Sequence, residues 1–266
     1  MAKFMQMINM IQSTSITDID DFLKYKIPIH NKPIFKIYGE RNSGTNFLER
    51  ILYINGFEYF SEKRIKDIYF FWKHGTPNNI IKRYAKPLVE IFIFRKLDDW
   101  LISMFHNPYH LNWNNQEKNF SKFLTKKQSK ELVCNISQNQ KTYMRDYRTN
   151  NYINLEDDGK TIFEIRYYKY KSIIEYFYNN NNVIIVSLHY LQNNNNLIHF
   201  LKSISETYNI KLHNVNVNLP HTKSNLPYVK NTKYNININN YRSIIDKYKN
   251  SDIEKNIDNL EFIIQK

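Results

Sequence analysis

The stretch Ile34-Phe-Lys-Ile-Tyr-Gly-Glu-Arg-Asn-Ser-Gly-Thr-Asn-Phe-Leu-Glu49 decides the fold that we expect for this chain. Its apolar start predicts a buried strand, and the apolar residues between Thr45 and Gly56 recur at helical spacing. The turn between them is bounded by Gly39 and Gly44, and the whole chain has only 5 glycines. A strand, a tight turn and a helix in succession present backbone N–H groups and a helix N-terminus to an anion. The stretch therefore predicts a loop that binds phosphate or sulfate.

The two glycines bear on the kind of anion that the loop binds. Gly39 and Gly44 have the G-x-x-x-x-G spacing of a nucleotide-binding P-loop. Thr45 and Asn46 follow, so the lysine that contacts the β- and γ-phosphates of a nucleotide is absent. This absence disfavours ordinary hydrolysis of a magnesium–nucleotide complex. A P-loop nucleotide kinase or NTPase stays as one alternative, and its ligand binding would require Mg2+.

A second segment supplies another candidate anion site. The apolar run Val89–Phe94 predicts a strand that ends at Arg95. Ser103 follows eight residues later, within a segment that we expect to be helical. An arginine and a serine in this arrangement can bind one phosphate, the arginine through a charged fork and the serine through a neutral donor.

Three segments, in this order, resemble the sulfotransferases that use 3′-phosphoadenylyl sulfate (PAPS). Residues 42–46, Asn-Ser-Gly-Thr-Asn, are similar to the family's loop that holds the 5′-phosphosulfate. Residues 71–77, Phe-Trp-Lys-His-Gly-Thr-Pro, resemble the strand end that provides the catalytic histidine. Arg95 and Ser103 match the pair that binds the 3′-phosphate, with the family's spacing. The resemblance extends over residues 34–110.

The resemblance implies transfer of a sulfuryl group from PAPS to a hydroxyl or amine of an acceptor, with 3′-phosphoadenosine 5′-phosphate (PAP) as product and no metal. It implies that His74 accepts the proton of the acceptor. Arg41 and Lys73 would stabilise the leaving oxygen, because Asn42 stands where the family has a lysine. The residues expected to bind the cofactor are Arg41, Asn42, Ser43, Gly44, Thr45, Asn46 and Phe47 at the 5′-phosphosulfate, with Arg95 and Ser103 at the 3′-phosphate.

The departures from the family pattern leave alternatives open. Asn42 in place of lysine is compatible with a non-catalytic module that has the same fold and binds a nucleotide or a polyanion. A later segment, Val183–Leu191, is similar to a family strand that ends in a Tyr-Glu-Asp-Leu turn, but His189 stands where the acid would be. The sequence does not specify the acceptor, since a glycan, a protein or a small hydroxyl compound all suit the reaction.

Short apolar runs alternate with longer segments that have apolar residues at helical spacing. This alternation predicts an α/β fold with a central parallel sheet flanked by helices on both faces, and the resemblance makes it P-loop-like. Residues 1–30 are interpreted as an N-terminal appendage and residues 31–266 as a single domain. The asparagine runs Asn179–Asn182 and Asn193–Asn196 are expected to be loops. The expected strands are Ile34–Tyr38, Ile68–Lys73, Val89–Phe94 and Val183–Leu188. Besides the helix after the first loop, the expected helices are Leu97–Phe105, Phe120–Val133, Phe163–Tyr178 and Leu197–Tyr208.

The chain has a net charge of +13, from 38 Lys+Arg against 25 Asp+Glu. This charge reflects either a lysine-rich composition or a basic field that steers a polyanionic cofactor or an acidic acceptor to the site. Nucleic acid is not an expected partner. The basic and aromatic run Arg166–Lys171 continues at helical spacing, which predicts an amphipathic helix in preference to a platform for stacked bases.

The composition also bears on the cellular location of the protein and on whether it binds a metal. Cys134 is the only cysteine, so no disulfide can form within the chain and a reducing compartment is expected. No apolar run has the length of a membrane span, and the first residues are too polar for a signal peptide, so a cytoplasmic location is expected. His106 and His110 have the spacing of a zinc pair, but Pro108 would interrupt the helix which that spacing needs. No metal site is therefore expected.

Overall fold

The computed structural model describes residues 33–58, 88–107, 119–127, 160–212, 215–217 and 235–265. All of them belong to one compact unit, Asn31–Lys266. The expected N-terminal appendage and the expected strand Ile68–Lys73 lie outside the described residues. The same is true of Lys73 and His74, the expected catalytic pair.

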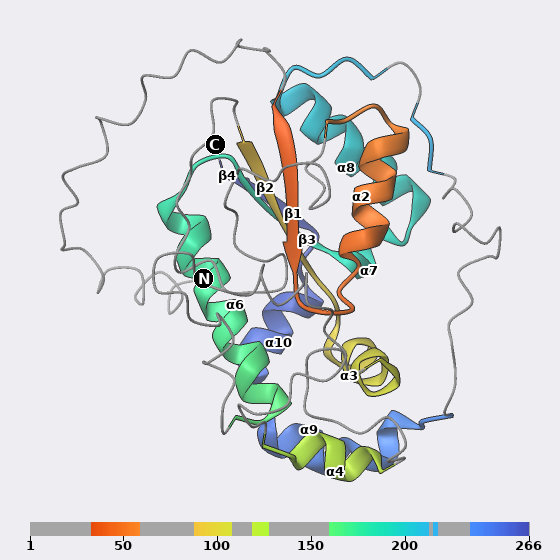
Figure 1. Cartoon of the computed structure of the whole chain (residues 1–266), viewed down its shortest axis with the longest axis vertical. Coiled ribbons are helices and arrows are strands. Elements are labelled where there is room, and N and C mark those ends of the chain that lie inside the picture. Colours follow the sequence, from red (N-terminus) through yellow and green to blue (C-terminus); the bar gives the residue numbers. More distant parts are fainter. Residues whose placement is uncertain are drawn as a thin grey trace, which may run out of the picture. The chain divides into compact units, whose positions relative to one another are not determined.

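The described part of the chain has an α/β architecture around a four-stranded sheet with the order β1-β2-β3-β4 (Figure 1). β1 (Ile34–Gly39), β2 (Leu88–Phe94) and β3 (Val183–Ser187) are parallel to one another. β4 (Phe262–Gln265) is antiparallel to β3. The predicted α/β class is confirmed, whereas the prediction of a wholly parallel sheet is wrong because of β4.

The direction of β4 follows from the short connection that leads to it. α10 (Ser251–Asp258) is followed by only three residues before β4 begins at Phe262. The N–H of Ser187, at the carboxyl end of β3, donates to the carbonyl of Glu261 at 3.0 Å. The chain thus enters the sheet at the carboxyl end of β3, and a parallel strand would need a crossover of about a dozen residues or more. β4 therefore runs back along β3.

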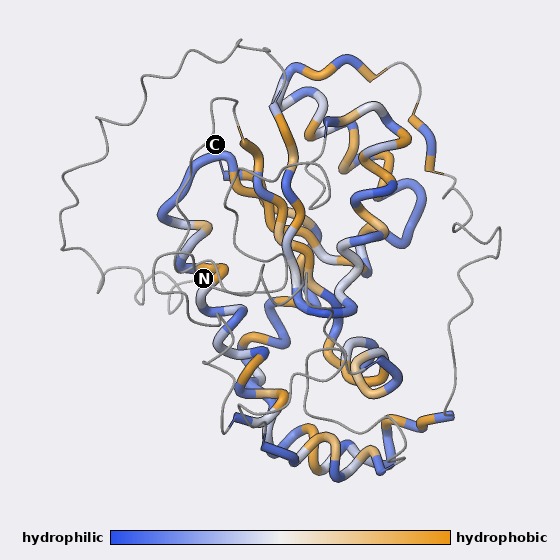
Figure 2. Tube along the Cα trace, viewed as in Figure 1, coloured by the Kyte–Doolittle hydropathy of each residue, from blue (hydrophilic) through white to orange (hydrophobic). Residues whose placement is uncertain are grey.

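Helices cover both faces of the sheet, as the alternation of strands and helices predicts. Side chains alternate between the two faces of a strand. One face packs against α2 (Thr45–Ile54) and α8 (Asn194–Thr207), and the other packs against α6 (Ile162–Asn179) and α10 (Figure 1). Figure 2 shows that the strands are largely hydrophobic, while the loop after β1 is hydrophilic. The strand residues of the α2–α8 face are Phe35, Ile37, Val89, Ile91, Ile93, Ile184 and Val186, and those of the α6–α10 face are Tyr38, Phe92, Phe94, Val183 and Ile185.

A further apolar cluster lies beyond the carboxyl ends of the strands (Figure 1). It joins α3 (Leu97–His106), α4 (Phe120–Thr125), the start of α6 and α9 (Arg242–Tyr248). The 3-10 helix η3 (Ile238–Tyr241) leads directly into α9 and packs against the same cluster. This cluster fixes α3, and α3 in turn borders the loop after β1.

Local capping explains where the long helices begin. The hydroxyl of Thr161 accepts from the N–H of Glu164, and the carboxylate of Glu164 accepts from the N–H of Thr161, so α6 begins with a capping box. At α8, Oδ1 of Asn193 accepts from the N–H groups of Asn195 and Asn196. The prediction that Asn193–Asn196 is a loop is therefore wrong, because asparagine is a preferred N-cap and this run starts a helix.

Two other expected boundaries differ from the structure. α4 ends at Thr125, before the expected Val133, because Lys126 has an extended backbone. The expected strand Val183–Leu188 ends one residue early, and Leu188 begins the short helix α7 (Leu188–Leu191). The other predicted strands and helices within the described residues agree with the observed ones to within a few residues at each end.

Candidate functional site

The β1–α2 loop, residues 40–44, is a tight turn with two left-handed residues. Asn42 has φ 60°, and Gly44, the N-cap of α2, has φ 104°. Glycine and asparagine tolerate this conformation better than other residues. Both the N–H and the hydroxyl of Ser43 donate to the carbonyl of Glu40, at 3.2 and 2.7 Å. The buried Ser43 therefore shapes the turn with both of its donors.

The glycines of the loop are needed for close contacts with neighbouring elements. A Cβ at Gly39 would lie 2.6 Å from the carbonyl oxygen of Ile93 on β2 and would also meet the hydroxyl of Ser43. A Cβ at Gly44 would lie 2.7 Å from a methyl carbon of Leu188 on α7. The loop is thus pressed against β2 on one side and the start of α7 on the other, which leaves no room for larger residues.

The side chain of Asn42 joins the loop to α3. Its amide nitrogen donates to the carbonyls of Ser103, at 3.3 Å, and Asn107, at 3.1 Å, and also contacts the sulfur of Met104. Nη1 of Arg95 donates to the carbonyl oxygen of Asn42 at 3.1 Å. The loop, Arg95 and the Ser103 segment, which sequence analysis assigned to one cofactor, therefore lie together in the structure.

The other residues of the predicted cofactor set occupy different environments. Arg41 is half-buried, and its carbonyl oxygen accepts from the indole N–H of Trp100 at 2.8 Å. Thr45 is buried at the start of α2, whereas Asn46 is exposed. Phe47 is half-buried and packs against the core on the α2–α8 face of the sheet. Phe47 thus contributes to the site through the position of its backbone in the first turn.

A buried arginine outside the predicted set connects the loop to the rest of the fold. Arg166, on α6, is only 1% exposed and pairs through Nη1 with the carboxylate of Glu40. Its Nε and Nη2 donate to the two carboxylate oxygens of Glu254, on α10, at 2.8 and 2.9 Å. Nη2 also donates to the carbonyl oxygen of Arg95 at 2.7 Å. The guanidinium carbon lies 4.8 Å from the centre of the Trp100 ring.

The spacing of the apolar residues on α6 indicates that Arg166 is buried, although its charge suggests an exposed position. On α6, the buried residues Ile162, Tyr170, Ile173 and Phe177 recur at helical spacing, and Arg166 lies on the same face. An arginine inside an apolar stripe requires buried partners. The basic and aromatic residues around Arg166 predict only an amphipathic helix, so they indicate neither the burial of Arg166 nor its pairing with Glu254.

The charges of this cluster shift the pKa values of its members. Burial raises the pKa of Glu40 to about 7, although the neighbouring Arg166 opposes the rise. Burial alone would lower the pKa of Arg166, but Glu40 and Glu254 outweigh it, so its pKa is raised. Among the described residues, Oε1 of Glu40 has no hydrogen-bond partner. One guanidinium thus serves two carboxylates, and burial raises the pKa of Glu40 in spite of this ion pair.

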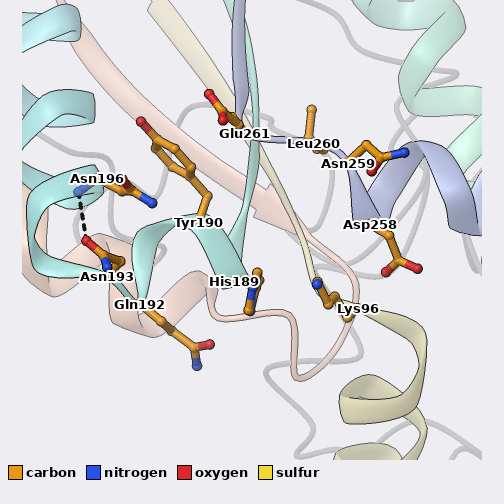
Figure 3. Close-up of a pocket in the computed structure, with 10 residues that line it drawn as sticks. All are labelled: Lys96, His189, Tyr190, Gln192, Asn193, Asn196, Asp258, Asn259, Leu260 and Glu261. Atoms are coloured by element: carbon orange, nitrogen blue, oxygen red, sulfur yellow. Dashed lines mark hydrogen bonds between the residues drawn. The ribbon is translucent and has the colours of Figure 1, made fainter.

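A hollow of about 650 Å³ opens at the carboxyl ends of β2 and β3 (Figure 3). Lys96, directly after Arg95, and His189, directly after Leu188, line it near the β1–α2 loop. His189 is the residue that stands where the sulfotransferase pattern has an acid. The remaining lining residues are Tyr190, Gln192, Asn193, Asn196, Asp258, Asn259, Leu260 and Glu261.

The chain matches no protein-family model, no curated protein and no solved structure. Within the described residues, no three His, Cys, Asp or Glu side chains gather in a way that could hold a metal ion. None of the described helices combines the length and hydrophobicity that a membrane crossing needs.

Replacement of Arg166 by alanine should destabilise the protein strongly. It would leave the carboxylates of Glu40 and Glu254 buried without their cation, a change that typically lowers the free energy of unfolding by about 3–5 kcal/mol. The matched control is Arg242→Ala, because Arg242 makes a two-point ion pair with Asp98 and is 38% exposed. Its loss should be about 1 kcal/mol or less. Urea unfolding of both variants tests this ranking, and equal losses would contradict it.

The raised pKa of Glu40 predicts a pH dependence of stability. In the unfolded chain the carboxyl group ionises near its ordinary value of 4.5, whereas in the folded protein it does so at about 7. The folded state therefore binds more protons between these values, and the stability that Glu40 contributes falls as the pH rises from 4.5 to 7. The slope is at most about 1.4 kcal/mol per pH unit, and the loss levels off only once the pH is about one unit above the folded pKa.

Unfolding of the native protein and of Glu40→Gln, measured across this pH range, isolates the effect. The difference in their free energies of unfolding should shift as the pH rises from the unfolded value through the folded one, and should level off about one unit above the folded pKa. Glu175→Gln serves as the control, because it removes an exposed carboxylate that pairs with Lys171. A constant difference between native protein and Glu40→Gln at every pH would disprove the assignment.

Proposed function

We propose that the chain is a sulfotransferase that moves a sulfuryl group from PAPS to a hydroxyl or amine of an acceptor, without a metal, on a P-loop-like fold. The observation that supports this proposal is the hydrogen bond from Nη1 of Arg95 to the carbonyl oxygen of Asn42, at 3.1 Å. It brings the two candidate anion-binding elements together at the carboxyl edge of the sheet. This is the edge at which ligands bind in open α/β sheets.

The N-terminus of α2 is suited to the 5′-phosphosulfate. The first N–H groups of a helix have no partner within the helix, and the helix dipole favours an anion there. Gly44 caps α2 without a side-chain hydrogen bond. The backbone from Gly44 to Phe47, which includes the buried Thr45, would therefore contact the 5′-phosphosulfate.

Arg95 and Ser103 are suited to the 3′-phosphate. Arg95 lies at the end of β2, and its backbone is held by Arg166 on the carbonyl side. A guanidinium has five N–H donors, so the single bond to Asn42 does not exhaust it. Ser103 is half-buried on α3, and its carbonyl accepts from the amide of Asn42, as does the carbonyl of Asn107. Asn42 therefore links the loop that we propose for the 5′-phosphosulfate to the helix that we propose for the 3′-phosphate.

PAPS supplies the sulfuryl group, and its transfer needs an in-line path and positive charge near the leaving oxygen. Arg41 is one candidate for that charge, because it lies in the β1–α2 loop, where its carbonyl oxygen accepts from the indole N–H of Trp100. Lys73 is the other candidate, and His74 is the candidate base that takes the proton of the acceptor. Both stand outside the described residues, and their roles come from the sequence resemblance.

One observation favours a second candidate function, a non-catalytic module that binds a nucleotide or a polyanion. The residue at the position of the family's loop lysine is Asn42, and its amide is engaged by the carbonyls of Ser103 and Asn107. The side chain at this position is therefore structural. Catalysis depends on whether Arg41 or Lys73 supplies the missing charge. A nucleotide kinase or NTPase is separated from both functions by a requirement for Mg2+ in binding.

Calorimetric titration should show that PAP binds more tightly than AMP, which lacks the 3′-phosphate. One charged phosphate contact is worth on the order of 1.5–3 kcal/mol, so the expected ratio of Kd values is roughly 10- to 150-fold without Mg2+. Arg95→Ala should remove most of this ratio. Equal binding of PAP and AMP to the native protein would contradict the assignment of Arg95 and Ser103.

A control variant separates loss of the phosphate contact from loosening of the loop. Asn42→Gly keeps a residue that tolerates φ 60° but removes the amide that joins the loop to α3. It should weaken PAP and AMP by a similar factor and so leave their ratio unchanged. If Arg95→Ala behaves in the same way as Asn42→Gly, Arg95 acts only on the loop and not on the 3′-phosphate.

His74→Ala should lower turnover by about 10²- to 10⁴-fold, the usual contribution of a general base. The Kd of PAP should stay the same, because a base contacts the acceptor and not the phosphates. The release of PAP from PAPS, with water as acceptor, measures turnover before the natural acceptor is known. A parallel loss of PAP affinity and turnover would instead indicate a structural histidine.

A further inference from the structure

The hollow at the carboxyl ends of β2 and β3 differs in charge from the rest of the molecule. The chain has a net charge of +13, yet the lining contains two carboxylates, Asp258 and Glu261, beside one lysine, Lys96. Two carboxylates repel phosphate and sulfate groups, so the hollow is unsuited to the anionic parts of PAPS. A ligand of a different chemistry fits it better.

Most of the remaining lining residues have amide side chains. Gln192, Asn193 and Asn196 come from α7 and the start of α8, and Asn259 follows α10 (Figure 3). Oδ1 of Asn193 already caps α8, so Asn193 offers its amide N–H groups as donors. Each of the other amides offers both donors and acceptors, and each carboxylate offers acceptors. Such a set matches hydroxyl groups, which also donate and accept.

Few of the residues that line the hollow are hydrophobic or aromatic. Leu260 is one apolar residue, and Tyr190 is buried, with its hydroxyl 2.8 Å from Nδ1 of His199. Sites for aromatic or lipid ligands are lined mainly by hydrophobic and aromatic side chains. This hollow has too few of them to hold a phenol or an acyl chain by burial.

The hollow adjoins the candidate cofactor site on two sides. Lys96 follows Arg95, which bonds to the β1–α2 loop, and His189 follows Leu188, which packs against Gly44. Figure 3 shows the side chains of Lys96 and His189 at the end of the hollow toward that loop, with Asn193 and Asn196 on the α8 side. A molecule in the hollow would therefore present its near end to the loop.

We propose that this hollow binds the acceptor, and that the acceptor is an uncharged, polyhydroxylated molecule, that is, a neutral carbohydrate. The role of the bound molecule as acceptor rests on the proposed sulfotransferase function. The binding of a neutral carbohydrate is inferred from the lining residues alone. Amides and carboxylates of the hollow bond to hydroxyl groups, and Asp258 and Glu261 exclude molecules that already have sulfate or phosphate groups.

Saturation-transfer NMR with maltotriose, cellotriose, mannotriose and chitotriose as probes tests the proposal on the full chain. At least one trisaccharide should bind, and sulfated forms of the same sugar should bind more weakly. Asn196→Ala and Asp258→Ala should each raise the Kd roughly tenfold, the effect of about one hydrogen bond. Asn195→Ala is the matched control, since Asn195 does not line the hollow and both asparagines use their backbone N–H on Asn193.

The titration with PAP on the same variants separates the two proposals. If PAP binds but no trisaccharide does, or if p-nitrophenol or a tyrosine peptide binds instead, the carbohydrate assignment is overturned while the sulfotransferase function stands. If Asn195→Ala weakens sugar binding as much as Asn196→Ala, the sugar does not occupy the hollow and the assignment fails. If a trisaccharide binds in the hollow but PAP does not bind, the carbohydrate site is supported and the sulfotransferase function fails.

Discussion

The buried guanidinium of Arg166 is the interaction on which the candidate site depends. It bonds to Glu40 in the β1–α2 loop, to Glu254 on α10 and to the backbone of Arg95 at the end of β2, and it lies over the ring of Trp100 on α3. A buried charge is tolerated only when its hydrogen-bonding groups are satisfied. Those elements must therefore hold one relative arrangement, and that arrangement places Arg95 against the loop.

The same cluster sets the charge beneath the loop. With Glu40 ionised, two carboxylates share one guanidinium, which leaves an excess negative charge under a site proposed for anions. Burial raises the pKa of Glu40 to about 7, so protonation removes that excess near neutral pH. An anion in the loop would favour the protonated form further. The cations that face a ligand must then come from elsewhere, and Arg41 and Arg95 are the nearest in sequence to the loop and the strand end.

The strong local patterns of the sequence predicted β1, α2, β2 and α6 correctly, because each has an apolar period that matches its burial. β4 was missed because four residues give too short a pattern, and its direction is set by the position of α10. The order of the strands and helices placed Arg95 and α3 next to the loop, where Arg95 bonds to the carbonyl of Asn42 and the amide of Asn42 bonds to the carbonyl of Ser103. That Arg95 and Ser103 bind one phosphate stays a prediction. Arg166 and the hollow did not follow, because each arises from residues far apart in the chain that meet only in the folded protein.

Asn42 shows how a departure from a family pattern can be understood from backbone geometry. At φ 60° an asparagine is more favourable than a lysine, and its short amide reaches the carbonyls of Ser103 and Asn107. A lysine here would lose both the conformational preference and the link to α3. The loop therefore gains a fixed position relative to the proposed 3′-phosphate site and gives up the charge of a lysine. That exchange is compatible with sulfuryl transfer only if a neighbouring cation acts on the leaving oxygen. Arg41 is adjacent in the same turn, and its carbonyl is held by Trp100. The catalytic interpretation therefore depends on Arg41.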